Sequence, residues 1–256
     1  MQILVAIHGI LTSQTDPSWP DKFDAWMFRR DPRVRVLKKE YRAGPFPRWN
    51  CWVKDPLLAR GLANEIELFL SNQQPPATSS NQPCRPWFIA HSNGAVIALL
   101  AAKRLVARGY LIGGLVLTGA ACEADVEKNG VLAWSSAGAL GAAIAYSSPD
   151  DAVLDGDADH SALSARPSLL RRLREFVWGK LMWPYGCLGR TGWLCRGAAF
   201  PAQPRIFTRW FAGGHCAYFT PENLERTFEQ IYRDTVKSDC SDGPDESDRS
   251  DETVSA

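Results

Sequence analysis

The most informative segment of the sequence is Trp87-Phe88-Ile89-Ala90-His91-Ser92-Asn93-Gly94-Ala95. Its first four residues form an uninterrupted apolar run, which is typical of a strand buried on both faces. The segment 95–106 follows at once, and its Ala- and Leu-rich composition favours a helix. We therefore expect a buried strand that turns sharply into a helix, with Ser92 at the turn.

Comparable apolar runs lie on both sides of this stretch and alternate with helical patterns. The sequence predicts six strands, over 3–7, 34–37, 87–90, 115–118, 143–146 and 205–210. It predicts helices over 21–29, 57–70, 95–106, part of 126–141, 168–183 and 221–236. Thr220 and Pro221 suit the N-cap and first position of the last helix. This alternation indicates an α/β fold with a mostly parallel sheet, helices on both faces, and ligands at the carboxyl ends of the strands.

Charge and composition divide the chain into two parts. The 256 residues are 45% hydrophobic, which is enough for one substantial core, and the net charge of +1 gives no reason to expect a nucleic-acid partner. The segment 237–256 carries a net charge of −5 and has no aromatic residue. Such a segment cannot bury enough apolar surface to order itself. We expect a folded domain over 1–236 and an acidic, disordered tail over 237–256.

Targeting signals and metal motifs are not recognisable. The opening Met1-Gln2-Ile3-Leu4-Val5-Ala6-Ile7 has no basic region before its short apolar run, so it does not resemble a signal peptide. No apolar stretch reaches the roughly 18 residues of a transmembrane helix. The seven cysteines are odd in number and contain no C-x-x-C pair. We therefore expect a cytoplasmic protein with free thiols and with neither a cofactor nor a metal ion.

The residues around Ser92 match the strand–turn–helix motif G-x-S-x-G, with Ala90 in the position of the first glycine. Small flanking residues are needed because the serine of this motif has a strained backbone and lies close to its neighbours. The hydroxyl then projects above the sheet at the N-terminus of a helix, where a developing negative charge is favoured. The alternative is an ordinary serine N-cap.

The first strand ends in His8-Gly9-Ile10. Here the chain resembles the α/β-hydrolase superfamily, in particular its lipase- and esterase-like serine hydrolases, over residues 1 to about 236. The resemblance implies the α/β-hydrolase fold in a compact form of about six strands. It also implies an oxyanion hole made by the backbone N–H groups of Ile10 and Asn93, with His8 bonded within its own loop. The alternative is a turn with no role.

A serine nucleophile needs a base, and the chain has four histidines. His215 follows the last strand in Phe211-Ala212-Gly213-Gly214-His215, which is where the family has its catalytic histidine. His91 adjoins Ser92 in the chain, and its side chain is expected to point away from the reaction centre. His160 lies in an Asp-rich segment and is expected to be solvated.

The acid that orients the histidine lies between Ser92 and His215 in the family's order. The segment after the fifth strand is similar to the family's acid loop, and this similarity selects Asp151. Asp150 is one position away and stays an alternative. Glu123 and Asp125, which follow the fourth strand, are a second alternative.

Between the acid and the histidine, about 156–203 forms an insertion that is rich in aromatic residues. It is either a cap or lid beside an acyl pocket or a segment that only covers the sheet. The sequence as a whole predicts a carboxylic-ester hydrolase that forms an acyl-enzyme on a small-molecule or lipid-like acyl ester. The alternatives are a thioesterase or amidase with the same triad, and a non-catalytic α/β-hydrolase-fold protein that binds a ligand or a partner.

Overall fold

A computed structural model describes residues 2–10, 18–41, 50–72, 84–154, 186–195 and 205–237. Its strands form a single sheet in the order β2-β1-β3-β4-β5-β6, and every neighbouring pair is parallel. The strands are β1 (Gln2–Ile10), β2 (Val34–Tyr41), β3 (Trp87–His91), β4 (Ile112–Thr118), β5 (Leu140–Ser147) and β6 (Arg205–Trp210). The prediction of a six-stranded parallel sheet is confirmed.

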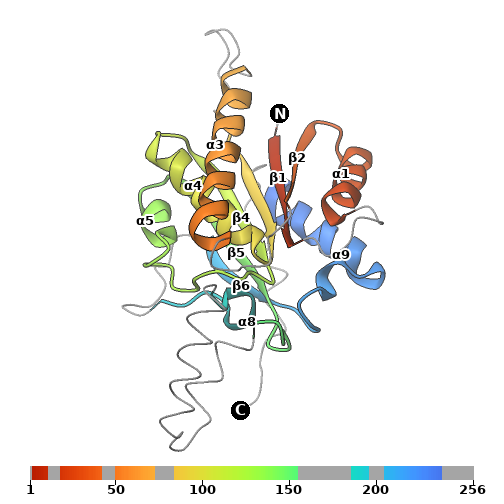
Figure 1. Cartoon of the computed structure of the whole chain (residues 1–256). Helices are drawn as coiled ribbons and strands as arrows, with labels where there is room; N and C mark the ends of the chain where they lie inside the picture. The colour runs from red at the N-terminus through yellow and green to blue at the C-terminus, as the bar shows by residue number, and fades with distance from the viewer. Residues whose placement is uncertain are drawn as a thin grey trace, which may run out of the picture.

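Helices cover both faces of this sheet (Figure 1). The helices are α1 (Trp19–Arg30), α3 (Asp55–Asn72), α4 (Gly94–Ala107), α5 (Val131–Ser136), α8 (Leu188–Thr191) and α9 (Pro221–Tyr232). Short helical turns complete the set: η1 (Asn50–Lys54), η2 (Ala217–Phe219) and η3 (Arg233–Lys237). Helices α3, α4 and α5 lie on one face, and α1 and α9 lie on the other.

The core forms two layers because successive side chains of a strand point to opposite faces. In β1, Ile3, Val5 and Ile7 pack toward α3 and α4, while Leu4 and Ala6 pack toward α1 and α9. All five side chains are fully buried. Burying a large aliphatic side chain contributes about 1.5–3 kcal/mol, so the continuous apolar runs of the strands account for much of the stability.

The last predicted helix ends earlier than expected. Helix α9 stops at Tyr232, and the chain continues as the π-helical turn η3. Asp234 in this turn accepts hydrogen bonds from the Tyr146 hydroxyl at 2.6 Å and from two nitrogens of Arg209 at 2.6 and 2.9 Å. These contacts hold the turn against β5 and β6. Thr220 occupies the N-cap position, but its hydroxyl donates to the Ala217 carbonyl and caps no N–H.

The insertion predicted over 156–203 is described only at 186–195, which packs on the sheet. The Gly189 N–H donates to the Ala120 carbonyl at 2.8 Å, and the Trp193 N–H donates to the Thr208 hydroxyl at 3.0 Å. The helix predicted over 168–183 and the tail beyond Lys237 lie outside the described residues. Within the described part of the chain, no helix is long and apolar enough to cross a membrane.

Candidate active site

Ser92 lies at a strained turn between β3 and α4. Its φ is 55°, and no other described residue except glycine has a positive φ. The surroundings fix this conformation: the Ser92 N–H donates to the Thr118 carbonyl at 3.1 Å, and the Ser92 carbonyl accepts the N–H of Ala121 at 3.1 Å. Asn93, not Ser92, occupies the N-cap of α4. The reading of Ser92 as an ordinary N-cap is therefore wrong, because its hydroxyl has a different partner.

Two glycines let the end of β1 approach this turn. A Cβ atom on Gly94 would lie 2.8 Å from the Ile7 carbonyl oxygen and 2.9 Å from that of His8. A Cβ atom on Gly9 would lie 2.7 Å from the Ser92 Cβ and 3.3 Å from its Oγ. Any larger residue would push the loop after β1 away from Ser92. The two glycines therefore let the end of β1 pack closely against Ser92 and the start of α4.

The structure brings together Ser92, His215 and Asp151 at the carboxyl ends of β3, β6 and β5. The Ser92 Oγ lies 2.9 Å from His215 Nε2, and His215 Nδ1 lies 2.8 Å from an Asp151 carboxylate oxygen. With the imidazole proton on Nδ1, His215 donates to Asp151 and accepts from Ser92. This chain of hydrogen bonds is the arrangement by which a general base activates a serine hydroxyl.

The Asp151 carboxylate is fully buried, and both of its oxygens are hydrogen-bonded. One oxygen accepts from His215. The other accepts the backbone N–H groups of Val153 at 3.1 Å and Leu154 at 3.2 Å. A buried carboxylate without such donors would be costly, so the turn after β5 holds Asp151 in place for its contact with the histidine.

The other acidic candidates have different partners among the described residues. Asp150 is exposed, and its carboxylate accepts the Gly213 N–H at 3.4 Å. Glu123 is exposed and pairs with Lys128 at 3.7 Å. Asp125 is buried, and its carboxylate accepts the N–H groups of Glu127 and Lys128. Only Asp151 of the four candidates is hydrogen-bonded to His215 in the described part of the chain.

The expectation that His91 points away from the reaction centre is wrong. Its ring is buried, with its centre 4.9 Å from that of His215, and its Nε2 lies 3.0 Å from the His215 carbonyl oxygen. Burial, together with the neighbouring His215, lowers the pKa of His91 to about 3. The ring is therefore neutral near pH 7, and its Nε2–H donates to the backbone of His215. Sequence reasoning missed this contact.

The remaining described members of the predicted site lie at the end of β1 and at the start of α4. Asn93 is the N-cap of α4, and Ile10 ends β1 directly after Gly9, where an added Cβ atom would lie 2.7 Å from the Ser92 Cβ. The His8 Nδ1 lies 3.3 Å from the Gly9 carbonyl, and burial lowers the pKa of His8. His160 lies outside the described residues. Among those that are described, no group of three or more His, Cys, Asp or Glu side chains is arranged to hold a metal ion.

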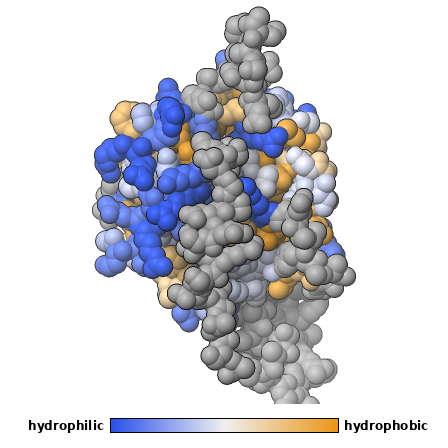
Figure 2. Space-filling view, turned by 180° about the vertical axis from the view of Figure 1, so that it is seen from behind, coloured by the Kyte–Doolittle hydropathy of each residue, from blue (hydrophilic) through white to orange (hydrophobic). Residues whose placement is uncertain are grey.

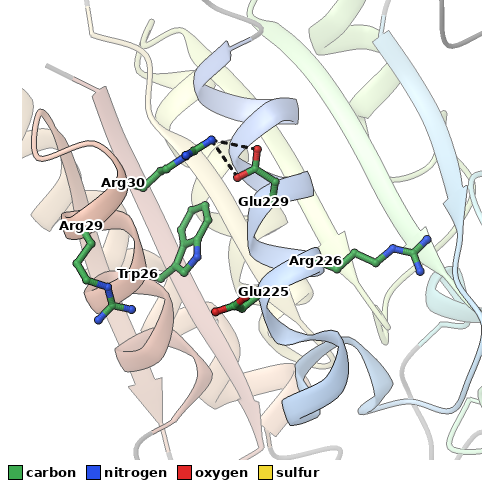
Figure 3. A pocket seen from close by; sticks show the side chains of 6 residues that line it. All are labelled: Trp26, Arg29, Arg30, Glu225, Arg226 and Glu229. Atoms are coloured by element: carbon green, nitrogen blue, oxygen red, sulfur yellow. Dashed lines mark hydrogen bonds and ion pairs between the residues drawn. The ribbon is translucent and has the colours of Figure 1, made fainter.

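A hollow of about 490 Å³ lies elsewhere, between α1 and α9 (Figure 3). Its lining residues are Trp26, Arg29, Arg30, Glu225, Arg226 and Glu229. Hydrophilic side chains gather on this side of the molecule (Figure 2). Since the lining includes neither Ser92 nor any residue bonded to it, the hollow is separate from the candidate site.

The parallel sheet has the strand order of the α/β-hydrolase fold. Ser92, whose backbone is in the left-handed conformation, lies between its third strand and the next helix, as this fold requires. The resemblance to this superfamily is confirmed at the level of the fold. The strand order and the turn at Ser92 carry that assignment.

Comparisons with known proteins find only distant structural likenesses. No protein-family model matches the chain, and no curated protein matches its sequence. Among solved structures, the NocB thioesterase domain from the nocardicin cluster is 16% identical, with 92% of this chain and 94% of that chain covered and a TM-score of 0.46. The RedJ thioesterase from the prodiginine pathway of Streptomyces coelicolor is 15% identical, with 90% and 89% covered and a TM-score of 0.42.

Proposed function

We propose that this chain is a serine hydrolase that cleaves a carboxylic (acyl) ester through an acyl-enzyme intermediate. Ser92 is the nucleophile, His215 the base and Asp151 the acid that orients it. The observation that carries the proposal is the continuous hydrogen-bonded chain from the Ser92 Oγ through the His215 imidazole to the buried Asp151 carboxylate, at 2.9 and 2.8 Å.

The reaction follows from these contacts. His215 Nε2 takes the proton of Ser92 as the Oγ attacks the acyl carbonyl carbon. The oxyanion is bound by the N–H groups of Ile10 and Asn93. The C–O bond to the alcohol then breaks, and Nε2 returns the proton to the leaving oxygen. A water molecule, deprotonated by the same nitrogen, then attacks the acyl carbon. The bond to the Ser92 Oγ breaks, Nε2 returns the proton to Oγ, and the acid is released.

The same residues would cleave a thioester or an amide, because all three reactions can pass through an acyl-enzyme on the same serine. We place the ester first because the His8-Gly9 loop resembles that of lipases and esterases. The ratio of kcat/KM among matched acyl p-nitrophenyl esters, acyl thioesters and acyl anilides separates these alternatives. A thioester preference of more than about tenfold would reassign the substrate class.

Replacing the nucleophile tests the proposal most directly. The Ser92→Ala variant should lose turnover of p-nitrophenyl esters by about 10⁴-fold or more while remaining folded. Ser135→Ala is the matched control, because it removes a buried hydroxyl from α5 that has no hydrogen-bond partner among the described residues. Ester hydrolysis that survives in Ser92→Ala would contradict the proposal.

A non-catalytic protein that binds a ligand or a partner is the alternative from another class. The strained φ of Ser92 argues against it, because such strain persists where a reacting group must be held in place. A fluorophosphonate probe should label Ser92 in the folded protein. Absence of labelling, together with absence of ester turnover, would favour the binding protein.

A further inference from the structure

A buried polar cluster lies behind Ser92 and has no part in the triad. The Asn93 side chain donates from its Nδ2 to the Tyr41 hydroxyl at 3.0 Å and approaches the two carboxylate oxygens of Asp55 at 3.3 and 3.4 Å. Asn93 is 1% exposed and Asp55 is fully buried. The three residues come from the start of α4, the end of β2 and the start of α3, so the cluster joins three elements at the carboxyl edge of the sheet.

Asp55 is an expensive residue to bury. Burial raises its pKa to about 6, although the Asn93 hydrogen bond and the neighbouring charge of Lys54 oppose this rise. Placing a carboxylate here costs free energy that an apolar side chain would not cost. The described hydrogen bonds of the Asp55 carboxylate are to the Asn93 side chain. The contact that offsets part of this cost is therefore the one to Asn93, the residue after the proposed nucleophile.

The carboxylate also fixes which way the Asn93 amide faces. With Nδ2 toward Asp55, the amide donates to the carboxylate. A flipped amide would place its oxygen against the carboxylate oxygens, where both partners are acceptors. The Asn93 Oδ1 is buried and has no hydrogen-bond partner among the described residues. Asp55 therefore selects a single orientation of this side chain.

The anchored side chain belongs to the residue whose backbone N–H is the proposed oxyanion donor. The peptide that carries this N–H lies between two fixed points, the Ser92 backbone at a φ of 55° and the Asn93 side chain. Displacing the Asn93 Cα, and with it the N–H of the same residue, would pull the Asn93 amide away from Asp55 and Tyr41. The direction of the N–H is thus coupled to the buried cluster.

We propose that Asp55 and Tyr41 are positioning residues that hold Asn93 and so aim its backbone N–H at the developing oxyanion. This inference rests on the proposed function. It assigns Asp55 a role in transition-state stabilisation without contact to the substrate. Loss of a whole oxyanion donor typically lowers kcat by about 10²–10³-fold, so a misaimed donor should cost less, on the order of tenfold.

The test compares Asp55→Leu with Asp55→Asn. Asp55→Leu should lower kcat per active site by roughly tenfold while KM changes by less than about twofold, because the loss falls on the transition state. Affinity for a trifluoromethyl ketone, whose adduct with Ser92 places an oxyanion in the hole, should fall by the same factor as kcat. Asp55→Asn keeps an acceptor for the Asn93 Nδ2 and should restore most of both. Active sites are counted by fluorophosphonate titration.

Asp31→Asn is the matched control, since Asp31 is a buried carboxylate that pairs with Arg33 at 2.9 Å and lies outside this cluster. It should lower the melting temperature without changing kcat per active site. If Asp55→Leu behaves like this control, with unchanged kcat and ketone affinity, the inference is overturned. If Asp55→Leu does not fold, Tyr41→Phe removes one acceptor of the Nδ2 and should lower kcat and ketone affinity together by about threefold. An unlabelled, inactive wild type would instead overturn the proposed function itself.

Discussion

The carboxyl edge of the sheet and the hollow between α1 and α9 are both polar, but they are built differently. At the sheet edge, the side chains of Asp151 and His215 are 0% and 10% exposed, and a strained serine lies between strand and helix. In the hollow, Arg30 and Glu229 pair at 3.3 Å with side chains that are 47% and 28% exposed. The hollow is an open space lined by partly exposed side chains, whereas the polar groups at the sheet edge are buried and oriented by hydrogen bonds.

The two regions differ in whether their polar groups are buried or exposed, and this difference bears on which of them is suited to chemistry. A buried pair of charged or polar groups costs free energy unless every partner is in place, so its retention points to a role other than stability. An exposed ion pair is solvated and contributes little, so its presence has no such implication. Substitutions in the two regions should therefore have opposite profiles of activity and stability.

After the nucleophile itself, the largest effect is expected at Asp151, the proposed acid of the triad. Asp151→Asn should lower kcat by about 10³–10⁴-fold, because an amide cannot hold His215 in the tautomer that accepts the Ser92 proton or stabilise the imidazolium. Folding should be retained, since the amide oxygen can still accept the N–H groups of Val153 and Leu154. The rate of p-nitrophenyl ester hydrolysis and the melting temperature measure the two quantities.

Asp150→Asn is the control for this prediction. Asp150 is the next residue along the chain and is exposed, and its carboxylate contacts only the Gly213 N–H at 3.4 Å among the described hydrogen bonds. Its substitution should change kcat by no more than a few-fold. The opposite pattern, with Asp150→Asn inactive and Asp151→Asn active, would make Asp150 the acid of the triad.

A smaller effect is expected at His91. His91→Leu removes the Nε2–H that donates to the His215 carbonyl at 3.0 Å, and kcat should fall roughly tenfold as the imidazole loses its fixed position. His91→Gln can place an amide N–H near the same point and should recover most of the rate. Equal losses in both variants would mean that the packing of the ring, and not its hydrogen bond, is what matters.

The same pair of variants should change the dependence of stability on pH. The pKa of His91 is lowered from 6.5 to about 3 in the folded protein. Below pH 6.5 the unfolded chain therefore binds a proton that the folded protein does not bind. His91 thus lowers the free energy of unfolding as the pH falls, by up to about 1.4 kcal/mol for each pH unit. In both variants the free energy of unfolding, measured in urea titrations, should fall less steeply as the pH is lowered from 6 to 4, by about this slope.

The sequence predicted the parts of the molecule that local patterns determine. Strand β6 has the bounds predicted for it, and the turn at Ser92 could be recognised because a buried apolar run meets a helix within a few small residues. Strand β2 was predicted too short, because its second half contains Lys38, Lys39 and Glu40. On this edge strand Lys38 and Glu40 are exposed and Lys39 is half-buried, and Lys38 pairs with Asp21 and Asp24 on α1. Pairing with β1 and the ion pairs to α1 stabilise the second half of β2, although its charged composition does not favour a strand.

The contacts that complete the site could not be predicted, since they join residues distant in the chain. His91 meets the backbone of a residue 124 positions away, and Asn93 meets an aspartate 38 positions away. Adjacency to Ser92 suggested only that the His91 side chain would diverge from the serine. That adjacency gave no information on the loop after β6, whose residue His215 lies against the His91 ring. A buried aspartate before a proline, as at Asp55, carries no recognisable motif.

The smallest effect is expected in the hollow. Arg30→Ala and Glu229→Ala should leave kcat and KM for ester substrates unchanged within about twofold, because the hollow has no contact with the triad. Their ion pair is partly exposed, so a double-mutant cycle on the free energy of unfolding should give a coupling of at most about 1 kcal/mol. Salt at 1 M should reduce that coupling further, since screening acts on exposed pairs. If either variant lowered kcat/KM by more than about tenfold at an unchanged melting temperature, the hollow would take part in substrate binding. Exposure to solvent would then no longer distinguish the region that performs chemistry from the one that does not.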